Sequence, residues 1–314
     1  MLRQRPDEPL TTQSPAFLLV DAGNTRVKFG LFHKLCPPTG QLPACAAFAA
    51  HRIGDPALWP TARSAVADDV RLSRTVLTGS NPRQMERLVR EWPADWPPPD
   101  VLTDRTLLPI EIDVDEPQRV GIDRLLDAVA ANVLRAPGSP AIVIDVGTAT
   151  TVNAVSKSGA FVGGAILPGP ELCARALHEY TAVLPEVPLT DLLRGEPAVI
   201  GRNTEDAIRS GLYWGHWQAV LGYCERMQLP LGCPPEPLVL LTGGAAHLYA
   251  ERAPCGTPKE LQGSEHRTSR KNKVQQPISA VASRPPGAAR YEPHLTLQGL
   301  AVAVTHLFAD AGES

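Results

Sequence analysis

The sequence predicts an α/β protein made of two domains of similar topology that face one cleft. Its 314 residues, of which 43% are hydrophobic, are enough for two domains that each bury a core. A strand that ends in Asp-x-Gly occurs twice, once within 17–25 and once within 141–150. In both halves a strand, a turn, a second strand, a loop, a third strand and a helix follow in the same order. We interpret this repeat as an ancient duplication, with residues 16–138 and 139–314 as the two domains.

Apolar runs separated by turn residues define the elements of the N-terminal half. Residues 1–15 come before the first apolar run, and we expect them to form a disordered tail. The Gly23 turn joins the first two runs into a hairpin. The predicted elements are strands over 17–21, 27–32 and 45–53, a helix over 56–72, a strand over 75–79 and a loop over 92–100.

A longer helix is predicted from Gly121 to about residue 135, because apolar side chains recur there at helical spacing. Asp123, Arg124 and Asp127 lie off this apolar stripe, near the N-terminal end of the helix. The carboxylate of Asp123 can therefore face the cleft instead of the core. The stripe itself consists of Ile122, Leu125, Leu126, Val129 and Val133.

The second copy of the repeat opens the C-terminal half. A later apolar run over 238–241 ends in the Gly243-Gly244 turn and is expected to be a strand. Residues 252–290 are rich in Ser, Pro, Gly, Arg and Lys, so we expect a poorly ordered, low-complexity insertion there. The other predicted elements are strands over 141–145, 151–156 and 160–167, a helix after 168–170 and a C-terminal helix over roughly 295–309.

Composition gives no indication of a membrane or nucleic-acid protein. The net charge is −3, and no apolar stretch is long enough to span a bilayer. The apolar run at 16–20 is too short for a signal-peptide core. Six cysteines are present without any C-x-x-C pair, which argues against a zinc site. We expect a cytoplasmic protein with reduced thiols.

The two Asp-x-Gly turns, at Asp21 and Asp145, are the features that carry chemistry. A Gly in such a turn lets the backbone approach a ligand, and the amides and hydroxyls that follow can donate to phosphate oxygens. The carboxylate can face a metal ion or its water shell. Each turn alone could be an ordinary hairpin turn. Two of them facing one cleft indicate a nucleotide clamp, and hence phosphoryl transfer.

Gly121-Ile122-Asp123-Arg124 is a second candidate site. An acid in a first helical turn is usually a surface residue that stabilises the helix dipole. An Asp and an Arg at one helix N-terminus can also bind a hydroxy acid, with the Arg on the carboxylate and the Asp on the hydroxyl. The chain has no P-loop, G-x-G-x-x-G, G-x-S-x-G or H-E-x-x-H motif.

Three glycine-containing segments of the C-terminal half are less specific. Residues 163–169 and the Gly243-Gly244 turn could be only tight strand–helix junctions. Thr204, in the segment 201–204, could be only a helix N-cap. His178, His216 and His247 are most simply core or surface histidines, because none has a partner at metal-ligand spacing.

In their order along the chain, these segments resemble the type III pantothenate kinases, including the Bvg accessory factor branch. The matching motifs are D-x-G-N-T-x-x-K at 21–28, G-x-D-R at 121–124, D-x-G-T-A at 145–149, G-G-A-I-x-P-G at 163–169, G-x-N-T at 201–204 and T-G-G-A near 242.

The resemblance implies two RNase H-like domains of the acetate-kinase/actin/Hsp70 type around a ligand cleft. It also implies ATP-dependent phosphorylation of pantothenate, the first step toward coenzyme A, with Mg²⁺ and a homodimer. Two departures stand out: Val114 occupies a position where the family often has Tyr, and 252–290 is an insertion. By motif, ATP would be held by Asp21, Gly23, Asn24, Thr25, Lys28 and Thr148, pantothenate by Gly121, Ile122, Asp123, Arg124 and Thr204, with Asp123 as general base and Asp145 on a monovalent cation (K⁺ or NH₄⁺).

Two other functions are compatible with the sequence. A regulatory or transcription accessory protein could use the same fold for binding, and the basic stretch 267–273 could contact DNA phosphates. A solvated linker is the simpler interpretation of that stretch, because no recognition helix accompanies it. A sugar or acetate kinase of the same superfamily is the other alternative, and only the resemblance of the G-x-D-R segment argues against it.

Overall fold

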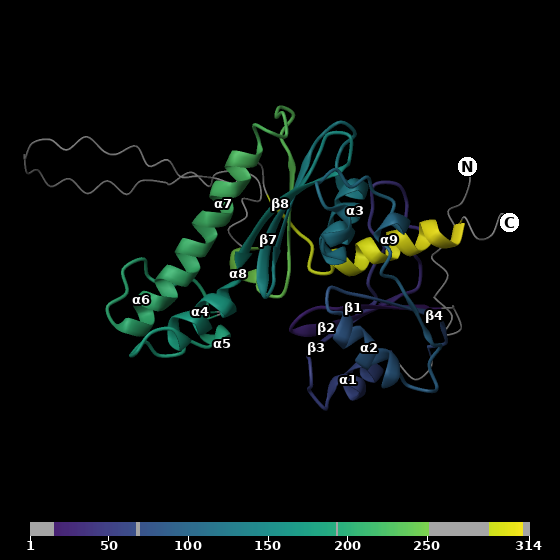
Figure 1. Ribbon diagram of the computed structural model, residues 1–314, viewed down its shortest axis with the longest axis horizontal. Coiled ribbons are helices and arrows are strands. Elements are labelled where there is room, and N and C mark those ends of the chain that lie inside the picture. Colours follow the sequence, from purple (N-terminus) through teal and green to yellow (C-terminus); the bar gives the residue numbers. More distant parts are fainter. Residues whose placement is uncertain (1–15, 67–69, 193, 251–288, 310–314) are drawn as a thin grey trace, which may run out of the picture.

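The computed structural model describes residues 16–66, 70–192, 194–250 and 289–309. These residues form two mixed β-sheets with helices around and between them (Figure 1). The expected tail at 1–15, most of the expected insertion at 252–290 and the basic stretch 267–273 lie outside the described residues. In the described part, no helix is both long enough and apolar enough to cross a bilayer.

The first sheet contains five strands in the order β3-β2-β1-β4-β5. Strand β1 pairs antiparallel with β2 and parallel with β4, because β1 and β2 are joined by a tight turn and β1 and β4 by a crossover. Six of the seven residues of β1 are buried, as expected for a central strand that is covered on both faces. The strands are β1 (Ala16–Ala22), β2 (Arg26–Phe32), β3 (Ala47–Arg52), β4 (Leu72–Thr78) and β5 (Pro99–Val101).

The second sheet repeats the first strand for strand. Its order is β10-β9-β6-β7-β8, which is the order of the first sheet read from the opposite edge. Strand β6 pairs antiparallel with β7 and parallel with β9, as β1 does with β2 and β4. The predicted two-domain α/β fold with an internal repeat is thereby confirmed. The strands are β6 (Ala141–Val146), β7 (Ala149–Val155), β8 (Phe161–Pro168), β9 (Leu238–Thr242) and β10 (Arg290–Tyr291).

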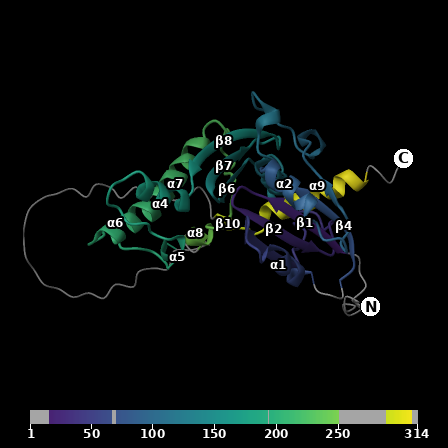
Figure 2. The ribbon, with the colours of Figure 1, turned by 60° about the horizontal axis from the view of Figure 1, so that its bottom comes forward.

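Helices α3 (Ile122–Leu134) and α9 (Leu295–Ala309) lie next to each other between the two sheets (Figures 1 and 2). One hydrophobic cluster contains residues of both helices together with Leu19 of β1, Val143 of β6 and Leu240 of β9. The C-terminal helix therefore packs on the N-terminal sheet as well as on its own half. The division at residue 138 stays a prediction.

Helices α1 and α2 pack on the first sheet and α7 and α8 on the second. Helices α4, α5 and α6 pack with the π-helix in a separate cluster, and Figure 1 shows α6 farther from the second sheet than α7. Their bounds are α1 (Leu58–Ala65), α2 (Pro82–Arg90), α4 (Pro170–Glu179), α5 (Leu189–Leu192), α6 (Thr204–Ser210), a π-helix (Gly211–Gly215), α7 (His216–Met227) and α8 (His247–Ala250).

The sequence-based element bounds need three corrections. The helix predicted over 56–72 ends at Ala65, and Leu72 already belongs to β4. The loop predicted over 92–100 includes the start of β5, where Pro99 is tolerated as the first residue of an edge strand. Helix α2 was not predicted, although Asn81 caps it by accepting from Gln84 N and a proline follows at the first helical position.

The α3–α9 contact predicts a large effect of adding one methyl group. A β-carbon on Gly299 of α9 would overlap the carbonyl oxygen of Leu126 in α3. We expect Gly299→Ala to lower the free energy of unfolding by about 1–3 kcal/mol, because two buried helices must separate. Urea-induced unfolding measures this change.

Gly222→Ala in α7 is the matched control. Its β-carbon would meet only the mobile end of Arg226, at 3.2 Å. Because Ala is the better helix former, Gly222→Ala is expected to be neutral or to stabilise by up to about 1 kcal/mol. Equal effects of the two substitutions would contradict the close approach of α3 and α9.

Candidate active site

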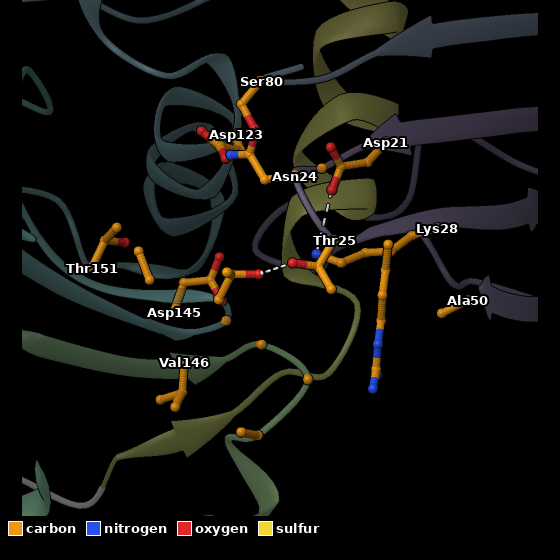
Figure 3. A pocket seen from close by; sticks show the side chains of 18 of the residues that line it. Asp21, Asn24, Thr25, Lys28, Ala50, Ser80, Asp123, Asp145, Val146 and Thr151 are labelled. Atoms are coloured by element: carbon orange, nitrogen blue, oxygen red, sulfur yellow. Dashed lines mark hydrogen bonds and ion pairs between the residues drawn. The ribbon is translucent and has the colours of Figure 1, made fainter. Parts of the chain in front are cut away.

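A pocket of about 370 Å³ lies between the two sheets and is lined by both copies of the repeat. Figure 3 shows Asp21, Thr25 and Lys28 of the first sheet near Asp145 and Thr151 of the second. Most of the residues that the sequence selected therefore meet in one place. Those that line the pocket are Asp21, Gly23, Asn24, Thr25, Lys28, Asp123, Arg124, Asp145 and Thr148.

The two Asp-x-Gly turns are similar, but the second is one residue shorter than the first. Gly23 N donates to Arg26 O (3.0 Å), and Gly147 N donates to Ala149 O (3.1 Å), so each turn is closed by one backbone hydrogen bond. The hydroxyl groups of Thr25 and Thr148 are hydrogen-bonded to each other at 2.7 Å (Figure 3). This bond joins the two halves across the cleft and places both threonines where a bound anion could accept from them.

Lys28 is paired with Asp21 at the base of the pocket, where their side chains are 3.3 Å apart. The two residues are cross-strand neighbours in the β1–β2 register. Burial by itself would lower the pKa of Lys28, but the carboxylates of Asp21, Asp145 and Asp127 raise it above its usual value. Lys28 is thus a fixed positive charge that several carboxylates share.

The carboxylates around Lys28 are short of partners. Oδ1 of Asp21, Oδ1 of Asp145 and Oδ2 of Asp127 are buried and accept no hydrogen bond from the described residues. Burial raises the pKa of Asp145 to about 6; Lys28 opposes this rise, and Asp123 and Asp21 add to it. Burial likewise raises the pKa of Asp21, against the effect of Lys28.

Asp127 was expected off the apolar stripe of its helix, yet its side chain is 1% exposed. Oδ1 of Asp127 accepts from Thr296 Oγ1 of α9 at 2.8 Å. Burial and the nearby Asp145 raise the pKa of Asp127 well above its ordinary value. The correction has a tertiary cause, because α9 covers the face of α3 that the sequence pattern left open.

Asp123 and Arg124 occupy the N-terminal turn of α3, beside the two Asp-x-Gly turns. Asp123 Oδ1 accepts from Arg124 N at 2.9 Å, and Arg124 Nε donates to Asn153 Oδ1 of β7 at 2.7 Å. The guanidinium also lies 5.3 Å from the ring centre of Phe161. Burial lowers the pKa of Arg124. The helix end thus presents a held cation and a carboxylate to one side of the pocket.

Three of the selected residues do not line the pocket. Gly121 is the N-cap of α3, and Ile122 packs in the core with 2% exposure, so both support the helix end. Thr204 begins α6, and Asn203 caps that helix by accepting from Asp206 N. A substrate contact by Thr204 stays a prediction. Val114 lies near β8, 3.8 Å from a β-carbon placed on Gly163.

Several pocket residues were not selected from the sequence. Glu171 of α4 lines the pocket and pairs at 2.5 Å with Arg52 of β3, which lies outside the lining; this pair adds a second link between the two halves. Phe48 and His294 pack with ring centres 4.4 Å apart. Phe48, Glu171 and His294 belong to no motif, and only the fold brings them together. The missed lining residues include Arg26, Phe48, Ser80, Thr151, Glu171, Tyr291 and His294.

The donor set fits a phosphate-bearing ligand with its cations. Among the described residues, no three His, Cys, Asp or Glu side chains form a complete metal centre. Unpartnered oxygens of Asp21 and Asp145 can each supply one ligand, and a ligand phosphate can supply others. Gly243, with φ at 103°, has no room for a β-carbon against Asp145, so its backbone comes close to that carboxylate.

Comparison with protein families gives a match over most of the described chain. The family model described as type III pantothenate kinase matches residues 17–226. The chain is 45% identical over 141 residues to the type III pantothenate kinase of Acidiphilium cryptum, covering 45% of this chain and 50% of that protein. It is 41% identical over 172 residues to that of Gluconobacter oxydans, covering 54% and 60%. The chain spans about half the length of the curated relatives it matches.

Solved structures resemble the chain more distantly. Component A of the (R)-2-hydroxyglutaryl-CoA dehydratase of Acidaminococcus fermentans has a TM-score of 0.49 at 15% identity, covering 95% of this chain and 100% of that one. A glucokinase from an Antarctic psychrotroph has a TM-score of 0.43 at 10% identity, covering 93% and 99%.

The raised pKa of Asp145 predicts how stability depends on pH. The folded protein binds the Asp145 proton more tightly than the unfolded chain, so this group's contribution is present below about pH 4 and is lost as the pH rises through about 6. Asp145→Asn cannot ionise. We expect it to raise the free energy of unfolding of the ligand-free protein by about 1–3 kcal/mol near pH 7.5 and to reduce the decline between pH 4 and 6. Chemical unfolding across that pH range measures both effects.

Asp55→Asn provides a control of opposite sign. Hydrogen bonds from Ala57 N and His51 lower the pKa of Asp55, so its contribution is present above about pH 4 and is lost at lower pH. Replacing it should therefore remove stability near neutral pH. An Asp145→Asn protein that is less stable than wild type near pH 7.5 would contradict this prediction. It would show that Lys28 stabilises the charged form of Asp145 by more than burial destabilises it.

Proposed function

The chain belongs to the type III pantothenate kinase family, and we propose that it transfers the γ-phosphoryl group of ATP to the hydroxyl of pantothenate. This reaction is the first step of coenzyme A biosynthesis. The observation that carries the proposal is that Asp123 and Arg124 share one pocket with both Asp-x-Gly turns. A hydroxy acid and a nucleotide can therefore be held side by side.

We assign the nucleotide to the two turns. The threonine hydroxyls of Thr25 and Thr148 can turn from each other to phosphate oxygens, and Lys28 supplies a fixed positive charge nearby. The unpartnered oxygens of Asp21 and Asp145 fit cations that accompany the phosphates. Bound Mg²⁺ supplies neutralisation of phosphate charge. Gly23 and Asn24 belong to the Asp21 turn and are assigned to the nucleotide with it.

We assign pantothenate to the N-terminal end of α3. Arg124, held by Asn153 at 2.7 Å, can bind the substrate carboxylate, while Asp123 faces its hydroxyl. Gly121 and Ile122 set the position of these two side chains, and Thr204 is proposed as a further contact. Val114, which lies beside Gly163 and outside the pocket lining, stands where the family often has a Tyr.

The proposed chemistry consists of positioning and one proton transfer. Asp123 accepts the proton of the substrate hydroxyl as that oxygen forms a bond to the γ-phosphorus, and the bond from this phosphorus to the bridging oxygen breaks to release ADP. The turn residues hold the phosphate chain in line with the hydroxyl. Little covalent help is needed, because the transition state of phosphoryl transfer is loose.

The proposal includes a homodimer in the cytoplasm. Edge strand β8 and the segments after it carry exposed apolar side chains, among them Ile166 at 64% and Ile200 at 81% exposure, which supports a second copy on this side. The five cysteines that the structure describes are all free thiols, which supports a reducing compartment.

ADP release tests the assignment of the substrate. The purified chain is given ATP, Mg²⁺ and K⁺ with a panel of small hydroxy acids, and ADP is followed by a coupled assay. We expect release that depends on pantothenate and exceeds that with glycerate, lactate or a sugar. Release that is equal with all acceptors, or independent of any acceptor, would count against a pantothenate kinase.

The monovalent cation proposed at Asp145 gives a second test. A bare carboxylate beside phosphates repels them, and a bound cation offsets the repulsion. We expect activity to rise with K⁺ or NH₄⁺ and to stay low in Na⁺, with Asp145→Asn losing this response. Steady-state rates at constant ionic strength measure it. Equal rates in the three salts would rule out the cation site.

The general-base role predicts the effect of Asp123→Asn. The amide keeps the shape of the side chain and can still accept a hydrogen bond from Arg124 N, but it does not take up a proton. We expect kcat to fall by roughly 10²–10⁴, with ADP affinity and melting temperature little changed. Steady-state kinetics and calorimetry measure these quantities.

Arg124→Ala is the matched comparison, since it removes a contact made in both the ground state and the transition state. It should mainly raise the KM for pantothenate, by about tenfold or more. An Asp123→Asn enzyme that turns over at close to the wild-type rate would show that the proton goes to another group.

A further inference from the structure

A buried hydrogen-bond chain lies behind the second phosphate turn and is not part of the chemistry described above. His216 Nε2 is 2.9 Å from Thr150 Oγ1, and His216 Nδ1 is 2.9 Å from the hydroxyl of Tyr249. Thr150 and Tyr249 are fully buried, and His216 is 9% exposed. Three elements thus meet at one imidazole: β7, the start of α7 and α8.

The imidazole is held in a defined state and orientation. Burial lowers the pKa of His216 to about 4, so near neutral pH one ring nitrogen donates and the other accepts. Tyr249 is fixed in turn, because its ring stacks on Trp217 with centres 4.6 Å apart. The chain Thr150–His216–Tyr249 therefore has both of its hydrogen bonds satisfied inside the core.

A π-helix sets the place of His216. Residues 211–215 form five residues of π-helix between α6 and α7, and His216 is the first residue after it. A π-helix is rare and is frequently found at functional sites. A continuous α-helix would give His216 a different direction.

The two outer residues of this hydrogen-bond network, Thr150 and Tyr249, are each attached to a turn that lines the pocket. Thr150 of β7 pairs with Val146, the residue that follows Asp145 in β6. The neighbours of Thr150 in the sequence, Ala149 and Thr151, line the pocket. Tyr249 follows the turn at Gly243, to which it is linked through the backbone by Tyr249 N to Ala246 O and Ala246 N to Gly243 O. The two turns touch where Ala245 N donates to Val146 O at 3.0 Å.

We propose that His216 is a positioning residue for the nucleotide half of the site: through Thr150 and Tyr249 it holds the Asp145 turn and the Gly243 turn at a fixed separation for a bound nucleotide. The inference rests on the proposed function, since it concerns the same pocket. It assigns a role to a residue that touches neither substrate. Loosening the chain should weaken nucleotide binding and leave the pantothenate side, built on α3, largely as it was.

Near-isosteric variants test the proposal with little disturbance of the fold. Thr150→Val and Tyr249→Phe each remove one hydroxyl, and Thr75→Val is the control. Thr75 is also fully buried and donates to Pro97 O at 2.8 Å, but it lies in β4 outside the pocket lining. The measurements are the melting temperature, the Kd of ADP by calorimetry without pantothenate, and the KM values of ATP and pantothenate.

We expect Thr150→Val and Tyr249→Phe each to raise the Kd of ADP and the KM of ATP by about three- to tenfold, with the KM of pantothenate within about twofold. Once one hydrogen bond of His216 is removed, removing the other should have little further effect on nucleotide binding. The double variant should therefore have a Kd of ADP close to that of the single variants. Thr75→Val should lower the melting temperature about as much as Thr150→Val and Tyr249→Phe do. It should leave the Kd of ADP and the KM values of ATP and pantothenate unchanged.

Two results would overturn the inference. One is a lowered melting temperature in both chain variants with an unchanged Kd of ADP, which would make the network purely structural. The other is an equal rise of both KM values. Because ADP binding is measured without pantothenate, a wild-type protein that binds ADP but does not phosphorylate pantothenate would refute the proposed function and leave this test valid.

Discussion

The partly buried ammonium of Lys28 is the charge on which the rest of the cleft depends. The β1–β2 register places it opposite Asp21 at 3.3 Å, β6 brings Asp145 to it, and α3 brings Asp127. Carboxylates held in a low-dielectric space repel one another unless a cation lies between them. The two sheets can therefore approach this closely only around Lys28, and the surplus of negative charge leaves the ligand-free site in need of further cations.

This surplus relates the stability of the protein to its function. Unpartnered oxygens on Asp21, Asp145 and Asp127 are unfavourable in the ligand-free protein and favourable when a nucleotide brings its cations. In the ligand-free protein two contacts join the halves: the hydrogen bond between Thr25 and Thr148 and the ion pair of Arg52 with Glu171. Binding energy from the cations can then be used to organise the turns that hold the phosphates.

Local sequence was sufficient for part of this account. The repeated Asp-x-Gly turns and the period of α3 predicted the duplication and the polar residues of the two turns and the α3 end that line the pocket, because these patterns depend on neighbouring residues only. Asp127 was misplaced because its burial depends on Thr296, 169 positions away. Glu171 and His294 were missed for the same reason. The network at His216 could not be predicted, since neither of its partners is near it in the sequence and the π-helix has no clear sequence signal.

Replacement of Lys28 tests the central charge arrangement most directly. Lys28→Met keeps the length of the side chain and removes its charge, so the ligand-free protein should lose about 1–3 kcal/mol of unfolding free energy near pH 7.5, because the buried carboxylate of Asp21 is left without its partner. Adding Asp21→Asn to this variant should restore much of the loss, because the unpaired charge is removed as well. A Lys28→Met protein as stable as wild type, or a double variant less stable than the single one, would contradict the account.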